Sequence, residues 1–353
     1  MSDPIIQTFC CQHNNKSDIS IVIMKEFDTN MYNNVCMISS IIGIFGAIYQ
    51  ILPRQVLIHQ HRWQNFSSYR ARNIIIWLAV ADFFASLGVF VRSLLWINFK
   101  NIMPTIDDTS SIIFCVISSA WTEYFYMVTW IWTLCYAIDM KLLLIEKPSR
   151  SYHLFAWTFP GLLTIIGLTI LYYPDANCHG SVNLKTALLK IMPNYIATYG
   201  LMTFVMIVNP ILYNLSNNDI HKAVTCNAGQ ITRRERKIFK TIKLKFALTN
   251  IVFLICWLPN LINGILLWIL WFNLPVKIVI ILWYIMAITN PLQAFFNAIV
   301  YQSWGKNIIF QKLLLFFNKN HDDLCEANEI SPLLTMPTNC GTTNSSINNS
   351  SSF

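Results

Sequence analysis

Seven long apolar stretches, separated by short polar segments, dominate the hydropathy pattern of this chain. Crossing a hydrocarbon core of roughly 30 Å takes about 20 helical residues, and each stretch is close to or above that length. Only helices suit such stretches, because a backbone in lipid must satisfy its own hydrogen bonds. The pattern therefore predicts an all-α membrane protein, a seven-transmembrane-helix bundle. The predicted spans are 31–52, 74–96, 112–138, 154–172, 193–213, 246–270 and 276–299.

The composition supports a membrane protein and excludes several other classes. The 353 residues are 55% hydrophobic and only 12% charged, which argues against a water-soluble protein of this size. Ten cysteines are too few for a disulfide scaffold, and without tandem C-x-x-C or H-E-x-x-H spacings the sequence predicts no metal site and no cofactor. The net charge is +8, but the basic residues lie between the apolar stretches, where they set the orientation of a membrane protein. We therefore expect no nucleic-acid partner.

The basic residues indicate how the bundle is oriented. Cytoplasmic loops carry an excess of lysine and arginine in membrane proteins. One side of the predicted bundle carries six such residues, namely Lys16, Lys25, Lys100, Lys185, Lys190 and Lys277. The other side carries eighteen: Arg54, Arg62, Arg70, Arg72, Lys141, Lys147, Arg150, Lys222, Arg233, Arg234, Arg236, Lys237, Lys240, Lys243, Lys245, Lys306, Lys312 and Lys319. The asymmetry predicts a lumenal or extracellular N-terminus and a cytoplasmic C-terminus.

Four segments follow from this topology. Residues 1–30 form a lumenal tail, in which Asn15 begins a glycosylation sequon. Residues 31–300 form the transmembrane domain. Residues 301–319 have the spacing of an interfacial amphipathic helix that binds membrane lipid, and residues 320–353 form a tail whose Asn, Ser and Thr content predicts disorder.

Four cysteines fall on the oxidising side: Cys10 and Cys11 in the lumenal tail, whose pairing the sequence leaves open, and Cys115 and Cys178 in the predicted bundle. Cys115 opens the third span and Cys178 lies in the loop before the fifth, so a disulfide between them would hold that loop over the helix ends. Two free thiols are the alternative. The other cysteines in or near the spans, Cys36, Cys135, Cys226 and Cys256, are expected to be free.

Ionisable side chains inside the hydrocarbon are costly and point to function. Arg92 of the second span and Glu123 of the third lie at similar depth in the outer half of the bundle. They could form a buried ion pair that fixes helix packing, or they could bind the carboxylate and ammonium of an amino acid. Aromatic walls of such a ligand pocket could come from Trp121, Tyr124 and Tyr126.

Two prolines interrupt the last two spans. Pro259 follows Trp257 in the sixth span, and Pro291 follows Asn290 in the seventh. Each proline removes a backbone hydrogen bond, so both positions are candidate hinges, although static membrane helices also contain prolines. We group Asp82, the acid at the middle of the second span, with these four residues as a candidate helix switch.

The last cytoplasmic loop ends in a basic face. Arg233, Arg236, Lys240 and Lys243 are three or four residues apart, which places them on one side of a helix that continues into the sixth span. This face could meet anionic lipid or an acidic protein partner. Asp139, about 36 Å along the third helix from Cys115, is expected at the same end of the bundle.

A series of short motifs extends these features along the chain. They are Thr8-Phe9-Cys10-Cys11, Phe114-Cys115-Val116, Cys135-Tyr136-Ala137 with Asp139, Leu171-Tyr172-Tyr173-Pro174, Asn209-Pro210-Ile211-Leu212, Ile255-Cys256-Trp257-Leu258 and Asn290-Pro291. In this order they resemble the G-protein-coupled receptors, and more narrowly the ocular albinism type 1 family of intracellular receptors. The chain has Asp139-Met140-Lys141 where rhodopsin-like receptors carry Asp-Arg-Tyr, and Asn290-Pro291-Leu292-Gln293-Ala294 lacks their tyrosine.

The resemblance implies a receptor and not an enzyme. It implies coupling to a heterotrimeric G protein through Asp139, Lys141 and the basic face, a location in melanosomes, lysosomes or late endosomes with the plasma membrane as a further site, and a ligand such as tyrosine, L-DOPA or dopamine. In the tail, Glu329-Ile330-Ser331-Pro332-Leu333-Leu334 has the pattern of an acidic dileucine signal, in which Glu329, Leu333 and Leu334 would bind a clathrin adaptor.

Two other functions of membrane proteins require residues that the predicted spans lack, and a third remains an alternative. A retinal receptor needs a lysine inside the seventh span, whereas Lys277 lies at its outer margin. An intramembrane protease needs paired catalytic groups, and Asp82 is the lone acid at the membrane centre. A transporter of small amino acids remains the alternative, since Arg92 and Glu123 could line a permeation path as well as a receptor pocket.

Overall fold

The computed structural model describes residues 26–52, 62–99, 109–142, 152–172, 192–226, 233–269 and 275–301. These ranges contain helices and no strand, and each predicted span overlaps one of them. The helices are α3 (Thr29–Ile51), α4 (Arg62–Asn98), α5 (Thr109–Leu142), α6 (Tyr152–Tyr172), the π-helix η2 (Ile196–Gly200), α8 (Leu201–Cys226), α9 (Arg233–Ile269) and α10 (Val276–Tyr301).

Six stretches of the described helices are long and apolar enough to cross a membrane: Thr29–Ile51, Ala71–Asn98, Tyr152–Leu171, Met192–Asn218, Thr241–Leu267 and Val276–Tyr301. The described part of the chain is all-helical, and the number of such stretches indicates a multi-pass membrane protein. Helix α5 is not among the six, so the third span stays a prediction. Every side chain of α5 from 126 to 137 is buried. A helix surrounded by protein needs no apolar stripe facing lipid.

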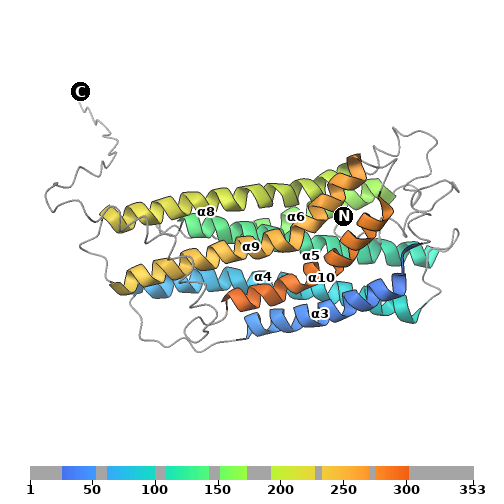
Figure 1. The fold of residues 1–353 in the computed structure, drawn as a ribbon, viewed down its shortest axis with the longest axis horizontal. Helices are drawn as coiled ribbons and strands as arrows, with labels where there is room; N and C mark the ends of the chain where they lie inside the picture. Colours follow the sequence, from blue (N-terminus) through green and yellow to red (C-terminus); the bar gives the residue numbers. More distant parts are fainter. Residues whose placement is uncertain are drawn as a thin grey trace, which may run out of the picture. The chain divides into compact units, whose positions relative to one another are not determined.

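The chain divides into two compact units, Met1–Asn218 with Thr241–Gln302 and Asp219–Lys240 with Ser303–Phe353. In the first unit, α3 packs between α10 and α4, α4 packs on α5, α5 on α6, and α6 on η2 (Figure 1). In the second unit, the described residues are the last turns of α8 and the first turns of α9. Because α9 is one helix from Arg233 to Ile269, the predicted continuity of the basic segment with the sixth span is confirmed.

The first unit exposes large apolar side chains and buries amide side chains beside its apolar core. Ile38, Phe45 and Ile165 are exposed on the helix surfaces, whereas Asn33 and Asn263 are buried. A protein in water buries its large apolar side chains and exposes its amides. The reverse arrangement suits a protein whose outer surface contacts lipid and whose polar side chains connect helices inside the bundle.

Helices α3 and α10 approach each other closely at Pro291. A Cβ on Gly43 would lie 2.2 Å from the Pro291 carbonyl oxygen, so only glycine permits this backbone separation. Four residues earlier in α10, the Ala287 carbonyl oxygen would accept a hydrogen bond from residue 291 if that residue were not proline. The Ser39 hydroxyl of α3 donates to this carbonyl at 2.6 Å, so α3 supplies the bond that the proline removes.

Candidate functional site

A small cavity of about 10 Å³ lies among α3, α4, α5 and α10. Arg92 of α4 and Thr122 of α5 line it, and both are almost fully buried. Tyr126 follows Thr122 by one helical turn and lines the same cavity. Asn290 and Pro291 bring the hinge of α10 to its wall. The cavity therefore joins the buried cation of α4 to the proline of α10.

Arg92 and Glu123, the proposed charged pair, have different neighbours. Arg92 faces the cavity with Thr122, whereas Glu123 accepts a hydrogen bond from the Thr198 hydroxyl of η2. Consecutive residues of a helix point about 100° apart, which explains how Thr122 faces one group of helices and Glu123 another. The contacts of Glu123 thus define a second polar position on another side of α5. An interaction between the two charges stays a prediction.

Two of the three predicted aromatic walls pack against neighbouring helices. The Trp121 indole N–H donates to the Phe84 carbonyl of α4 at 2.9 Å, and its ring lies over Gly88. The Tyr124 hydroxyl donates to the Trp157 carbonyl of α6 at 3.1 Å. These contacts hold α4, α5 and α6 together, and Tyr126 is the predicted aromatic residue that lines the cavity.

Tyr126 also connects the cavity to the hinge of α9. Its ring meets the Trp257 ring edge to face, with centroids 4.9 Å apart, and Trp130 meets Trp257 at 4.8 Å. The Trp257 indole N–H donates to the Gln293 amide oxygen of α10 at 2.5 Å. Trp257 lies two residues before Pro259, and Gln293 two residues after Pro291. One buried tryptophan of α9 therefore contacts both α5 and α10, close to Pro259 and Pro291.

Asp82 lies in a separate polar contact between α4 and α10. It is buried and accepts a hydrogen bond from the Asn297 side-chain amide at 3.3 Å. A second contact joins α10 to α9 near its proline, where the Thr289 hydroxyl donates to the Cys256 carbonyl at 3.3 Å. The residues that we grouped as a helix switch thus lie on helices joined by side-chain hydrogen bonds.

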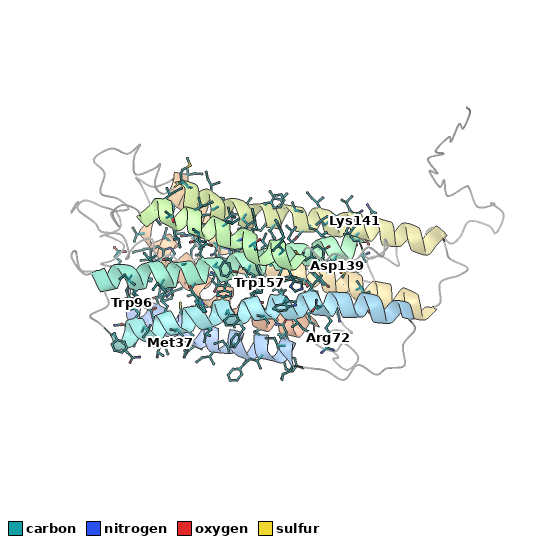
Figure 2. The ribbon with its side chains drawn as sticks, turned by 180° about the vertical axis from the view of Figure 1, so that it is seen from behind. Met37, Arg72, Trp96, Asp139, Lys141 and Trp157 are labelled. Carbon is teal, nitrogen blue, oxygen red and sulfur yellow. The ribbon has the colours of Figure 1, made fainter. Side chains whose placement is uncertain are left out.

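Asp139 and Lys141 lie toward the end of the first unit opposite Trp96. Figure 2 shows both residues and Arg72 toward one end of the helices, with Trp96 toward the other. Asp139 is fully buried, while Lys141 is partly exposed. Asp139 therefore lies within the helix packing, and Lys141 is the more accessible of the two to a partner.

The π-helix η2 was not predicted from the sequence, which indicated an ordinary helix over 193–213. Its Thr198 and Tyr199 side chains are consecutive and both buried. The Tyr195 hydroxyl donates to the Gly264 carbonyl of α9. Close by along α9, Asn263 accepts a hydrogen bond from the Trp283 indole at 3.0 Å. These contacts extend the polar position of Glu123 toward α9 and α10.

Several predicted residues lie outside the described part of the chain. They are Asn15, Cys178, Glu329, Leu333 and Leu334, together with the side chains of Cys115, Cys226, Arg233, Arg236 and Lys240. The predicted disulfide, glycosylation, sorting and interfacial-helix features therefore stay predictions. The thiols of Cys36, Cys135 and Cys256 are free and buried, as expected.

Sequence reasoning missed Tyr32, Cys36 and Thr122 of the cavity and Thr198 beside Glu123. A signal existed for Thr122, because it precedes Tyr126 by four residues and such pairs share a helix face. Tyr32 and Cys36 show the same spacing on α3. Thr198 gave no such signal, because the sequence does not show which side of its helix faces Glu123.

Comparison with known proteins gives one family and three relatives. The family model of the ocular albinism type 1 protein matches residues 1–319. The human G-protein coupled receptor 143 is 27% identical over 88% of this chain and 80% of its own length. Two Dictyostelium discoideum proteins match less: cyclic AMP receptor-like protein C is 23% identical over 54% of the chain and 53% of its own length, and cyclic AMP receptor 1 is 24% identical over 43% and 38%.

Proposed function

The chain belongs to the ocular albinism type 1 family, a family of receptors and not of enzymes, and from this premise we propose how the molecule signals. It is a G-protein-coupled receptor with seven spans, in which α5 is the third. Its N-terminus is lumenal or extracellular and its C-terminus cytoplasmic. The 27% identity to a human G-protein coupled receptor over most of both chains supports the coupling, and the loop charges support the orientation.

The proposed ligand is a small aromatic amino acid or catecholamine such as tyrosine, L-DOPA or dopamine. A buried cation at Arg92 and a buried acid at Glu123 are the two charges that an amino acid requires, and Tyr126 adds an aromatic surface. Ionisable side chains in a membrane interior are expensive to bury, so their presence on facing helices favours a binding role. Thr198 holds the Glu123 carboxylate and would orient it toward an ammonium group.

The observation that carries the receptor proposal is the contact of Trp257, a residue of α9, with both α5 and α10. Tyr126 lines the cavity and touches Trp257, and Trp257 bonds to Gln293. A ligand that moves Tyr126 would therefore disturb the packing of α9 and α10 beside Pro259 and Pro291. Because each proline weakens its helix locally, a small displacement there would move the cytoplasmic halves of both helices.

The cytoplasmic surface of the proposed receptor carries the coupling residues. Lys141 at the end of α5 and the basic positions at the start of α9 would contact an acidic surface of the G protein. Buried Asp139 would fix the end of α5 rather than touch the partner. The tail residues Leu333 and Leu334 would bind a clathrin adaptor and direct the receptor to melanosomes or other lysosome-related organelles.

The first experiment combines location with signalling. Leu333→Ala and Leu334→Ala are introduced together, the protein is imaged in cells, and G-protein activation is recorded with tyrosine, L-DOPA and dopamine. Cyclic AMP joins the panel because two relatives carry that ligand in their names. We expect relocation to the plasma membrane and a ligand-dependent signal.

Each other result removes a defined part of the proposal. Relocation without a signal to any ligand would contradict the ligand class and favour the transporter alternative, which uptake into sealed vesicles would then test. A signal without relocation would contradict the sorting role of the tail. Glu123→Gln separates ligand binding from folding, because we expect a weaker response to dopamine in a variant with normal surface expression.

A further inference from the structure

The cavity between α4 and α10 is chemically suited to an anion. Arg92 supplies a guanidinium, which has five N–H donors and can bind an anion in addition to its other contacts. Thr122 and Tyr126 add hydroxyl groups on the α5 side, and Tyr32 adds one from α3. Among the described lining residues there is one cation and no carboxylate. The cavity wall thus offers positive charge and O–H donors to whatever occupies it.

Two polar atoms at this wall lack partners in the described structure. The Thr122 hydroxyl is buried, with 1% of the residue exposed, and makes no hydrogen bond. The Asn290 amide oxygen is also buried without a partner. A buried polar group without a hydrogen bond costs about 1–3 kcal/mol. The unsatisfied Thr122 hydroxyl is a donor beside Arg92, and an anion would accept its hydrogen bond.

The size of the cavity limits the occupant. About 10 Å³ is room for roughly one water-sized sphere. A halide ion or one oxygen of a carboxylate is close to that size, whereas a phosphate or an aromatic ring is much larger.

We propose that Arg92, Thr122 and Tyr126 form a binding site for one small anionic group, which is a chloride ion or the carboxylate of the ligand. An anion there would bond to α4 and α5 beside Asn290 and Pro291 of α10. A bound anion would fix the distance between the hinge of α10 and the two helices α4 and α5. The carboxylate source rests on the proposed receptor function, whereas the chloride source does not.

The chloride arm uses the full-length protein purified into lipid nanodiscs. Thermal unfolding is compared in sodium chloride and sodium gluconate at equal ionic strength. For the wild type we expect a saturable rise in Tm with chloride, of about 2 °C or more. The rise should be lost in Arg92→Gln and reduced in Thr122→Val.

Thr122→Val is included because Arg92→Gln could lose the chloride effect simply by failing to fold. Because the Thr122 hydroxyl has no partner, its replacement by a methyl group should leave the Tm in gluconate unchanged or higher. Thr133→Val is the matched control, since Thr133 is a buried threonine of the same helix whose hydroxyl bonds to the Thr129 carbonyl at 2.9 Å. We expect this control to keep the full chloride effect.

The carboxylate arm compares two ligands that differ by one carboxylate. Signalling is recorded with L-DOPA and with dopamine in chloride-free medium. If the ligand supplies the anion, Thr122→Val should lower the potency of L-DOPA about tenfold and leave that of dopamine unchanged, because it removes one hydrogen bond to a charged group.

The outcomes separate the two sources and the two proposals. Chloride stabilisation that depends on Thr122 supports an inorganic anion, and a loss selective for L-DOPA supports the ligand carboxylate. Absence of both effects overturns the anion site. A wild type that responds to no ligand contradicts the proposed function, while the chloride arm still decides this inference.

Discussion

Replacing Ser39 by alanine tests the contact between α3 and the proline of α10. The Ser39 hydroxyl donates to the Ala287 carbonyl at 2.6 Å, in the place where Pro291 has no N–H. Ser39→Ala would leave this buried carbonyl without that donor, at a cost of about 1–3 kcal/mol by general hydrogen-bond energetics. Side-chain hydrogen bonds between membrane helices average only about 0.6 kcal/mol and reach about 1.7. We therefore expect a loss of about 1–2 kcal/mol in the free energy of unfolding.

The next residue supplies a matched control. Ser40 is fully buried on the same helix, and its hydroxyl has no hydrogen-bond partner in the described structure. Ser40→Ala removes the same atom without breaking a bond, so we expect little change in stability or a small gain. Both variants are measured by reversible unfolding of the purified protein in lipid-detergent micelles.

A double-mutant cycle with Pro291→Ala identifies the mechanism. Alanine at position 291 restores a backbone N–H that can donate to the Ala287 carbonyl, so the Ser39 hydroxyl becomes redundant. Ser39→Ala should then cost much less than in the wild type. An equal cost in both backgrounds, or equal costs for Ser39→Ala and Ser40→Ala, would refute the reasoning.

Two other contacts give further predictions. Gly43→Ala places a Cβ 2.2 Å from the Pro291 carbonyl oxygen and should lower the unfolding free energy by about 1–3 kcal/mol. Gly200→Ala is the control, because its Cβ would meet its nearest atom at 3.8 Å and should cost little in the same unfolding assay. Equal effects of the two substitutions would contradict the close approach of α3 and α10. Trp257→Phe removes the indole N–H that donates to Gln293 and should change the rate of G-protein activation in the absence of ligand. A nucleotide-exchange assay at matched expression measures this basal rate. An unchanged rate would argue against a role of Trp257 in coupling α9 to α10.

The apolar pattern predicted the helices well because length alone is decisive in lipid. Helix α4, however, begins at Arg62, twelve residues before the predicted span. The residues from 62 to 73 include three arginines and several amides and serines, so this part of the helix gives no apolar stretch in the hydropathy pattern. The start of α9 was predictable because Arg233, Arg236, Lys240 and Lys243 repeat with helical spacing. The π turn of η2 has no sequence signature of this kind.

The candidate site was predictable only in part, because the rotation of a helix within a bundle is a tertiary property. Trp121 and Tyr124 lie three residues apart and contact α4 and α6, whereas Tyr126 lies on another side of α5 and lines the cavity. The sequence fixes these relative directions, at about 100° per residue, but not which side faces the cavity. Arg92 and Glu123 were identified because a charged side chain is costly to bury in lipid. Their different neighbours could not be predicted, because they depend on how α4 and α5 are rotated about their axes within the bundle.

The complete burial of α5 between 126 and 137 bears on the biogenesis of the protein. A segment that enters the bilayer by itself must be favoured by lipid before it meets any partner. Helix α5 carries the ionisable Glu123 and the hydroxyls of Thr129 and Thr133, which are costly to place in lipid before partner helices are present. We expect its insertion to depend on α4 and α6 being retained beside it during synthesis. Substitutions at the α4–α5 contact, such as Gly88→Leu beneath Trp121, would then act on membrane integration and on quality control before they act on signalling.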